Sequence, residues 1–356
     1  MKLSADMKII EEYMSQNTGS YAAYENAKNL LPSGNTRSAL YWQPFPLCMR
    51  RGEGSYIWDV DGNKRVDYNY NNTTLILGHS HPRVIKAARA QMKNGTVLGA
   101  ATETEPRLAE EILGRLKGSD RIRFTPSGTE ANMQALRLAR AYTGRPLIAK
   151  CLGGYHGSWD GVPLTPDSAG IPEGVKGSTI YFPYNDSKAA ERMIKQHKDE
   201  LAAVVVEPTM RDMTPQPGFL ETLREETENH DILLVFDEVI SFRLAPGGAQ
   251  ELYDVTPDIT AMGKIIGGGF PVGAYASTIE TMGPLSIPAP ELQAFPVLGF
   301  SGTFNAFPIA MAAGLAVLKE LTRSRYDQLA DMGEVMRTGL RNVFIEEGIN
   351  VFVGGV

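Results

Sequence analysis

Cysteine, excess basic charge and long hydrophobic runs are all scarce in this sequence. Its 356 residues include two cysteines, Cys48 and Cys151, which allow one disulfide at most and exclude a disulfide-based scaffold. We therefore expect a reducing, cytoplasmic setting. The 35 lysines and arginines are outnumbered by 41 aspartates and glutamates, so no nucleic-acid partner is expected. The longest uncharged apolar stretch, residues 306–318, is too short to span a bilayer, so no membrane partner is expected either.

The common nucleotide-binding motifs are missing too. No GxxxxGK[ST] occurs, and Gly267-Gly268-Gly269 is followed by a glycine only at Gly273, so ATP and NAD are not expected as ligands. The first sixteen residues carry acids where a secretory signal would need an apolar core. The length suggests about two domains, and the composition is that of a soluble globular protein.

Two wholly apolar runs are typical of strands covered on both faces of a parallel sheet. They are residues 201–206 and 232–236, and a charged helical segment precedes each run. Glu207 follows the first and Asp237 the second. Ligands of open parallel sheets bind beyond the carboxyl ends of the strands, so both acids are candidate site residues. Ordinary strand-end polarity would also place acids there.

The two ends of the chain carry weaker patterns. Residues 1–31 are expected to form a helix, and alternation over 56–60 before a turn at 61–63 predicts a hairpin. Helical spacing of apolar residues over 326–344 predicts a last helix. Residues 349–353 are expected to start a strand with no following partner, so the C-terminal part looks cut short.

The segment Thr125-Pro-Ser-Gly-Thr-Glu-Ala131 predicts a capped helix start that can bind an anion. Ser127 and Glu130 have capping-box spacing, Gly128 allows close approach to the backbone, and Thr129 adds a hydroxyl donor. A well-capped helix without a ligand would explain the same pattern. The buried helix face is expected at Ala131, Ala135, Leu138, Ala139 and Tyr142.

Two further motifs are suggestive only in combination. Lys264 lies among apolar residues and glycines, a setting that can make its amine a nucleophile towards a carbonyl. The glycine-rich loop at 153–157 contains Tyr155, which offers a ring face, and His156, a polar handle. A surface lysine and a packed tyrosine are the plain alternatives. No metal site is expected, because the pair His79 and His81 has no further ligand at suitable spacing.

Taken together, these motifs suit a phosphorylated aromatic aldehyde. The phosphate requires amides, the ring a stacking partner, the pyridine nitrogen a carboxylate and the aldehyde an amine. The sequence in fact resembles the class III aminotransferases, which bind pyridoxal 5′-phosphate (PLP). The matching motifs are SGTEANMQALRLARAYTGR, YHGSWDG, LLVFDEVISFRLAPGG, PDITAMGKIIGGGFPVGAY and GTFNAFP.

Within this class the chain is similar to two branches. They are glutamate-1-semialdehyde 2,1-aminomutase and the β-amino-acid (β-phenylalanine-type) transaminases, and the segments PSGNTRSALYWQPFPL and DEVISFRLAPGG favour the second. The resemblance implies an α/β fold of PLP-dependent transferase type I, with a mostly parallel central sheet flanked by helices and a small α/β domain made of both termini. The expected parts are an N-terminal helix and hairpin at 1–60, a large PLP-binding domain at 61–310, and a shortened C-terminal small domain at 311–356.

The resemblance also implies roles for individual residues. Lys264 would bind the cofactor covalently and act as the catalytic base, and Asp237 would keep the pyridine nitrogen protonated. Arg37 would hold the substrate carboxylate, although a surface arginine is an equal alternative. The other cofactor contacts are expected from Ser127, Gly128 and Thr129 at the phosphate, Tyr155 and Val239 on the two ring faces, His156 and Glu207, and Thr303 reaching the phosphate of the partner subunit.

The implied activity is ping-pong transfer of an amino group from an amino acid, with a β-amino acid favoured, to an oxo acid. The implied partners are these small molecules and a second copy of the chain, in a homodimer with the site at the interface. The alternatives are an aminomutase, which returns the nitrogen to a neighbouring carbon, and a truncated PLP-binding protein without turnover. The stretch 159–175, rich in glycine and proline, is a candidate lid.

Overall fold

The computed structural model describes residues 2–286, 298–299 and 301–356 and divides into two compact units, Met1–Pro82 and Arg83–Val356. The expected domain boundaries near residues 60 and 310 stay predictions. Neither Cys48 nor Cys151 is in a disulfide. In the described part of the chain, no helix combines the length and apolar character needed to cross a bilayer.

The first unit contains two helices and a small antiparallel sheet. Helices α1 (Lys2–Gln16) and α2 (Thr18–Lys28) replace the single expected helix, because the chain leaves helical geometry at the buried Asn17. Single-turn 3₁₀ helices follow at 32–34 and 38–40. The sheet has the order β1-β2-β3, and pairing of β2 with β3 confirms the predicted hairpin. The strands are β1 (Met49–Glu53), β2 (Tyr56–Asp59) and β3 (Lys64–Val66).

The unit also contains a left-handed helical turn, α3 (Tyr70–Thr73), in which all four non-glycine residues have φ between 47° and 71°. L-residues disfavour this conformation, so hydrogen bonds must hold it. Asp67 Oδ1 accepts from the backbone N–H groups of Asn69 and Tyr70 at 2.8 and 2.9 Å. The hydroxyl of Thr73 is buried without a hydrogen-bond partner in the described part of the protein.

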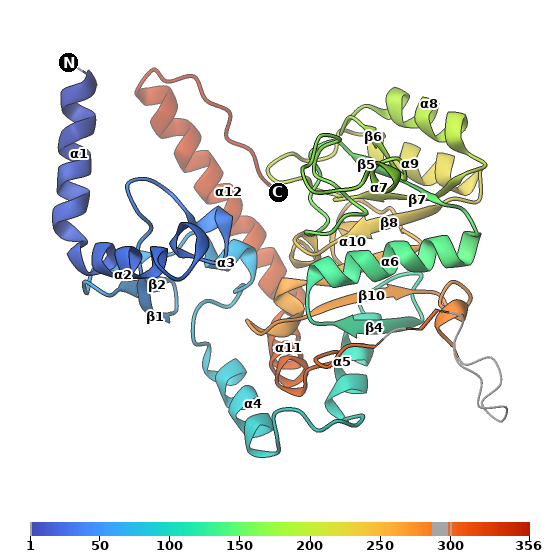
Figure 1. Ribbon diagram of the computed structural model, residues 1–356, viewed down its shortest axis with the longest axis horizontal. Coiled ribbons are helices and arrows are strands. Elements are labelled where there is room, and N and C mark those ends of the chain that lie inside the picture. The colour runs from blue at the N-terminus through green and yellow to red at the C-terminus, as the bar shows by residue number, and fades with distance from the viewer. Residues whose placement is uncertain (1, 287–297, 300) are drawn as a thin grey trace. The chain divides into compact units, whose positions relative to one another are not determined.

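A seven-stranded sheet forms the centre of the second unit, with the order β4-β10-β9-β8-β7-β5-β6 (Figure 1). Five adjacent strands run in parallel, and β10 is antiparallel to both β9 and β4. This mostly parallel sheet flanked by helices confirms the expected α/β class. The strands are β4 (Arg121–Thr125), β5 (Leu147–Cys151), β6 (Thr179–Phe182), β7 (Leu201–Val206), β8 (Leu233–Asp237), β9 (Ile259–Gly263) and β10 (Gly273–Ser277).

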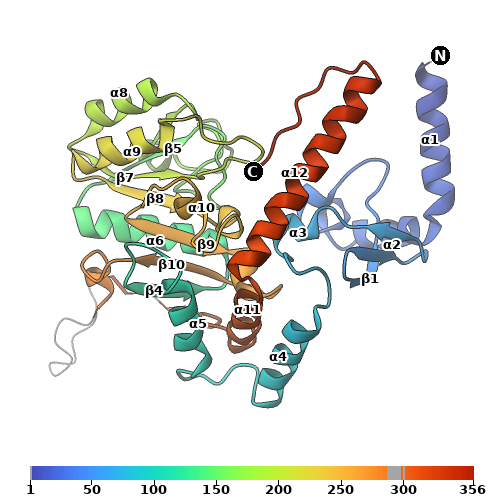
Figure 2. The same cartoon turned by 180° about the vertical axis from the view of Figure 1, so that it is seen from behind.

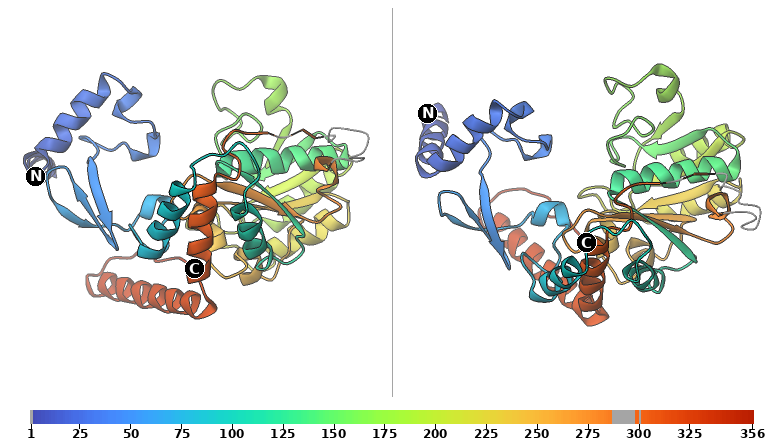
Figure 3. Two further views of the ribbon diagram at one scale, coloured as in Figure 1. Left: turned by 90° about the horizontal axis from the view of Figure 1, so that it is seen from below. Right: turned by 60° about the horizontal axis from the view of Figure 1, so that its bottom comes forward.

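Both faces of the sheet are buried, as the wholly apolar runs predicted. Val204 and Val206 of β7 pack in one core with residues of α8 and α9, and Ala203 and Val205 pack in the other with residues of α6. Figures 2 and 3 show these layers from other sides. The helices of this unit are α4 (Pro82–Lys93), α5 (Thr104–Leu113), α6 (Gly128–Thr143), α7 (Glu173–Lys176), α8 (Ser187–His197), α9 (Phe219–Glu228), α10 (Ala249–Leu252), α11 (Pro308–Glu320) and α12 (Arg323–Glu346), with 3₁₀ turns at 241–243, 264–267 and 283–285.

Two local expectations were wrong. Residues 349–353 do not form a strand, because Gly348 ends the chain's last helical segment with φ at +66° and no described strand pairs with these residues. Tyr142 is 39% exposed at the end of α6, where its hydroxyl hydrogen-bonds Glu280. The predicted helix over 326–344 is confirmed by α12, although Tyr326 is its one buried residue.

Candidate active site

Six described strands of the second unit end at the same edge of the sheet, and five of them lead to predicted site residues. The neighbouring parallel strands β7, β8 and β9 are followed or ended by Glu207, Asp237 and Lys264, and β5 leads into the loop that contains Tyr155. β4 runs in the same direction as β9, because both are antiparallel to β10, and it leads to Ser127. The predicted site residues of this unit, apart from Thr303, therefore come from one edge of one sheet.

Asp237 is the best-anchored side chain at this edge. It is 4% exposed, and its Oδ2 accepts a hydrogen bond from Asn132 Nδ2 at 2.8 Å. His156 Nδ1 lies 2.9 Å from the same oxygen, and the backbone N–H of Val239 donates to Oδ1 at 3.1 Å. A carboxylate with three partners from three elements has little freedom to rotate. The His156 Nε2 atom is buried and has no partner among the residues described.

Glu207 lies beside this pair. Its Oε1 accepts from the backbone N–H of Tyr155 at 3.3 Å, and its Oε2 is buried with no hydrogen-bond partner in the described chain. Burial, with a further contribution from the negative charge of Asp237, raises the pKa of Glu207 to about 8. Ligand atoms of His156, Glu207 and Asp237 lie within 4.8 Å of one another. This spacing suits a metal ion, but Asp237 Oδ2 already has two hydrogen-bonding neighbours, which makes it a poor ligand.

The N-terminus of α6 forms a second part of the site. Ser127 is the N-cap, and its hydroxyl accepts from the backbone N–H of Glu130 at 3.1 Å, as expected. A Cβ on Gly128 would lie 2.8 Å from a methyl group of Val239, and one on Gly157 would lie 2.6 Å from Thr129 Cα. Because both glycines are needed for these close approaches, the helix start, Val239 and the aromatic loop are packed together.

Lys264 follows β9 and begins the 3₁₀ turn at 264–267. Its φ of 50° is unusual for a residue other than glycine and is a source of backbone strain. A Cβ on the preceding Gly263 would lie 3.3 Å from Val239 Cγ1 and 3.6 Å from Gly128 Cα. Lys264 therefore leaves the sheet next to the start of α6 and to Val239, as the predicted site requires.

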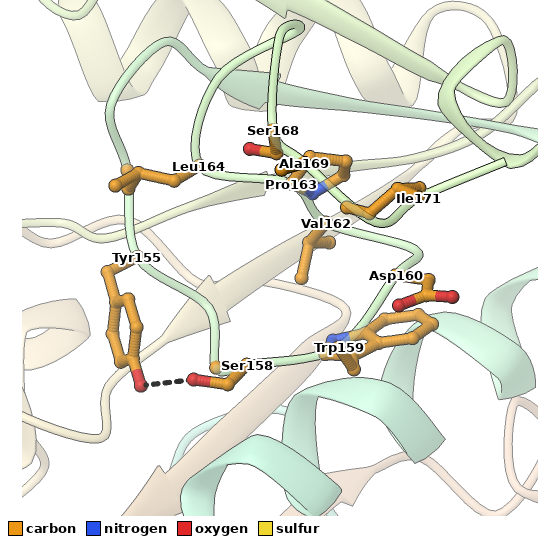
Figure 4. A pocket seen from close by; sticks show the side chains of 12 residues that line it. Tyr155, Ser158, Trp159, Asp160, Val162, Pro163, Leu164, Ser168, Ala169 and Ile171 are labelled. Atoms are coloured by element: carbon orange, nitrogen blue, oxygen red, sulfur yellow. Dashed lines mark hydrogen bonds between the residues drawn. The ribbon is translucent and has the colours of Figure 1, made fainter. Parts of the chain in front are cut away.

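Tyr155 stands at the side of a hollow of about 350 Å³ (Figure 4). The tyrosine is 54% exposed, and its hydroxyl lies 3.2 Å from Ser158 Oγ. The candidate lid contributes much of the opposite wall. The lining residues are Gly154, Tyr155, Gly157, Ser158, Trp159, Asp160, Val162, Pro163, Leu164, Ser168, Ala169 and Ile171.

Two predicted site residues are not part of this group. Thr303 is exposed and lines a separate hollow of about 310 Å³, together with residues 97–100 and 304–308 among others. Arg37 belongs to the first unit, where its guanidinium donates to Asn71 Oδ1 of the left-handed turn at 2.5 Å. His79, for which a metal role was not favoured, instead hydrogen-bonds Asp67 at 2.7 Å.

Two residues of the site were not predicted from the sequence. Asn132 donates to Asp237 from the first turns of α6, and its position beside the predicted buried residue Ala131 is the pattern that indicates it. Lys150 is fully buried beneath the aromatic loop. A lysine inside the apolar run of residues 147–151 is the corresponding sequence indication.

With this geometry in view, comparison with known proteins places the chain in a family. The model of the family "Aminotransferase class-III" matches residues 38–349, and the chain belongs to this class. It is 40% identical to the glutamate-1-semialdehyde 2,1-aminomutase of Methanothrix thermoacetophila, over 98% of this chain and 83% of that protein.

Two solved transaminases are similar in both sequence and structure. One is an omega-transaminase from Sphaerobacter thermophilus, with 43% identity, a TM-score of 0.89, and coverage of 92% of this chain and 78% of that chain. The other is a β-phenylalanine aminotransferase from Variovorax paradoxus, with 36% identity, a TM-score of 0.90, and coverage of 98% and 80%. Both branches that the sequence resembles are thus represented among its relatives.

Enzymes of this class depend on PLP. A further transaminase, with 37% identity, a TM-score of 0.89 and coverage of 94% of this chain and 81% of that chain, is described with PLP bound. The protein is therefore a class III PLP-dependent enzyme, and the predicted cofactor and fold type are confirmed.

Proposed function

We propose that this enzyme transfers an amino group from an amino acid, with a β-amino acid as the favoured donor, to an oxo acid. The observation that carries the proposal is the meeting of three features at one sheet edge. These are the buried, anchored Asp237, Lys264 at the end of the adjacent strand, and the capped N-terminus of α6. Such a set provides a carboxylate, an amine and backbone N–H donors around one space.

The residues present fit PLP in that space. Asp237 is held so that it can accept a hydrogen bond from the pyridinium nitrogen, and Ser127, Gly128 and Thr129 offer donors to the phosphate. Val239 and the exposed ring of Tyr155 are assigned to the two faces of the cofactor ring. The glycines at 128 and 157, where a Cβ would collide, favour a site shaped for close approach.

When bound, PLP supplies an aldehyde that takes up amine nitrogen and a ring that accepts an electron pair. The task of Lys264 Nζ is to hold the cofactor, then to remove a proton from the amine-bearing carbon of the substrate and to return it elsewhere. Asp237 keeps its partner nitrogen charged, because an ionised carboxylate favours the protonated form. His156 and Asn132 orient Asp237 for this task.

The donor class is inferred from Arg37 and from relatives. The β-phenylalanine aminotransferase supports a β-amino acid, whose carboxylate the Arg37 guanidinium would bind. The aminomutase relative supports the second candidate function, intramolecular amino transfer. A β-amino acid supplied with 2-oxoglutarate or pyruvate should give a new α-amino acid. Formation of 5-aminolevulinate from glutamate-1-semialdehyde without an acceptor would favour the mutase, and a yellow protein inert towards every amine would favour binding without turnover.

The proposed role of Lys264 has a direct test. Borohydride reduction of the PLP-loaded protein, followed by digestion, should leave a pyridoxyl adduct on the peptide that carries Lys264. Lys264→Ala should lose the adduct and at least about 10³-fold in turnover, because it removes both the anchor and the base. Lys188→Ala, which changes an exposed lysine of α8, is the control and should retain both. An adduct on another residue, or substantial turnover by Lys264→Ala, would contradict the proposal.

We also infer a cytoplasmic homodimer with the site at its interface, in which Thr303 contacts the phosphate in the partner subunit. The exposure of Thr303 beside a separate hollow is compatible with this role. Light scattering should give twice the chain mass of 38.9 kDa. Thr303→Ala should weaken PLP binding, and a monomer with full activity would contradict the inference.

A further inference from the structure

Lys150 of β5 is a fully buried lysine that the chemistry described so far does not use. Its Nζ donates to the backbone carbonyls of Gly154 at 2.6 Å and of Pro163 at 2.9 Å, and lies 5.7 Å from the centre of the Tyr181 ring. No carboxylate of the described chain lies within ion-pair distance of it. Gly154 and Pro163 both line the hollow in Figure 4, so Lys150 links two separate segments of its wall.

The peptide group between Gly154 and Tyr155 is held by Lys150 at its carbonyl and by Glu207 at its N–H. While its carbonyl accepts from Lys150 Nζ, its N–H donates to Glu207 Oε1 at 3.3 Å. One peptide unit is therefore fixed between a buried amine and a buried carboxyl group. The next residue, His156, is fixed in turn by Asp237. The peptide group before Tyr155 and the side chain of His156 after it are thus both held by hydrogen bonds.

Such an arrangement is costly to the folded protein. Burial lowers the pKa of Lys150 to about 8, although the negative charge of Glu207 acts in the opposite direction. An apolar side chain in this place would avoid that penalty. Costly buried charges occur preferentially where a protein must hold groups in a defined geometry for function. The geometry being held here is that of the loop carrying Tyr155.

We propose that Lys150 and Glu207 are positioning residues that hold the Gly154–Tyr155 peptide group from both sides and so fix the ring of Tyr155 against the cofactor. Through Pro163, Lys150 also fixes the width of the hollow beside that ring. This proposal rests on the proposed function, because the face of Tyr155 is useful only if a flat ligand binds there. Neither residue is required to touch the reacting atoms.

The first test uses the cofactor-free protein and amide hydrogen exchange. In Lys150→Met the side chain is similar in length but cannot donate, so both carbonyls lose their partner. Exchange over residues 153–164 should accelerate at least about tenfold, whether or not global stability falls. Val204→Ala, a core substitution in β7 that removes no hydrogen bond, is the matched control and should show no acceleration confined to this segment. Unchanged exchange in Lys150→Met would overturn the proposal.

The second test measures PLP affinity in a double-mutant cycle. Lys150→Met and Glu207→Met should each weaken PLP binding about tenfold, because each releases the same peptide group. The double variant should be no more than about threefold weaker than the worse single variant, since the loop is already released. Glu207→Gln keeps an oxygen that accepts from Tyr155 N–H and should restore most of the affinity.

The outcomes separate this proposal from the proposed function. Effects that multiply in the double variant would show that the two residues act independently and would overturn the shared role. Failure of the proposed function has a separate readout: the unmodified protein would then give no borohydride adduct on Lys264. Should Lys150→Met not fold, Glu207→Met tests the other side of the same peptide group by the same exchange measurement.

Discussion

Asp237 ends β8 and Glu207 follows the neighbouring strand β7, yet the two carboxyl groups differ in their hydrogen-bond partners. Asp237 has hydrogen-bonding neighbours at both oxygens, whereas Glu207 has a single donor, at Oε1, and its buried Oε2 has no partner in the described chain. Desolvation of a carboxyl group is tolerable when donors compensate it and costly when they do not. Burial raises the pKa of Glu207, and also that of the neighbouring Glu238, so the protonation of both acids should be coupled to folding.

A pH series should detect this coupling. The pKa of Glu207 is raised from 4.5 to about 8, so between these values the folded protein binds more protons than the unfolded chain. The contribution of Glu207 to the free energy of unfolding must then fall as pH rises through this window, by an amount on the order of a few kcal/mol. Glu207→Gln does not titrate, so the cofactor-free variant should gain stability relative to the unmodified protein from pH 5 to pH 8.

Urea unfolding at unit pH intervals gives the measurement. Glu221→Gln, which alters an exposed acid of α9, is the matched control and should leave the slope unchanged. A difference between Glu207→Gln and the unmodified protein that stays constant from pH 5 to pH 8 would contradict the raised pKa.

For single residues, the sequence predicts which side chains belong to the site but not which partners they contact. Ser127, Tyr155, Asp237 and Lys264 stand out because their local motifs are unusual. Asn132 and Lys150 do not, since their importance comes from partners that only the folded sheet brings near. The expected roles of Arg37 and Thr303 stay predictions for a related reason, because each depends on groups outside its own unit or chain.

Elements with a strong local pattern were predicted well. The β7 run, the β2–β3 hairpin and the cap of α6 follow from nearby residues alone. The expected strand at 349–353 failed because a strand needs a neighbour, which no local pattern supplies. The left-handed turn α3 was not predicted either, since its sequence contains no glycine.

That turn leads to a prediction about stability. Thr73 has a φ of 71° and a buried hydroxyl without a described partner, so Thr73→Gly relieves strain and removes an unpaired polar group. The gain should be about 1 kcal/mol after the larger backbone entropy of glycine is subtracted. Urea unfolding and amide exchange over residues 67–79 provide the measurement.

The adjacent threonine is a matched control. Thr74 has a φ of −70°, and its hydroxyl donates to the carbonyl of Asn71 at 2.8 Å. Thr74→Gly should therefore destabilise the protein by about 1 kcal/mol. If both glycine variants changed stability in the same direction, strain in the turn would not be the cause.

On the scale of the whole molecule, the close approach of β10 to the segment between β4 and α6 requires a glycine. Gly273 pairs with Thr125 across β10 and β4, and a Cβ there would lie 2.0 Å from the carbonyl oxygen of Ser127. Gly273→Ala should cost about 3 kcal/mol or more and should weaken PLP binding, because relief requires moving the start of α6. Chemical unfolding and PLP titration measure both effects.

Gly283→Ala is the control, because a Cβ at Gly283 meets nothing within 4 Å. Its stability should stay within about 0.5 kcal/mol of the unmodified protein. A Gly273→Ala protein as stable as this control would show that the β4–β10 junction tolerates side chains and that α6 is not fixed by it.

The same strand order has a consequence for how the protein is made. Among the strands that the structure describes, β4 has β10 as its one neighbour in the sheet. The two are synthesised about 150 residues apart, which makes their pairing a late and long-range event. A nascent chain that has just passed Lys264 already contains Ser127, Asp237 and Lys264, yet it lacks the strand that joins β4 to β9. Because the proposed cofactor site needs the start of α6 beside Lys264, we expect the protein to bind PLP only after β10 has been synthesised.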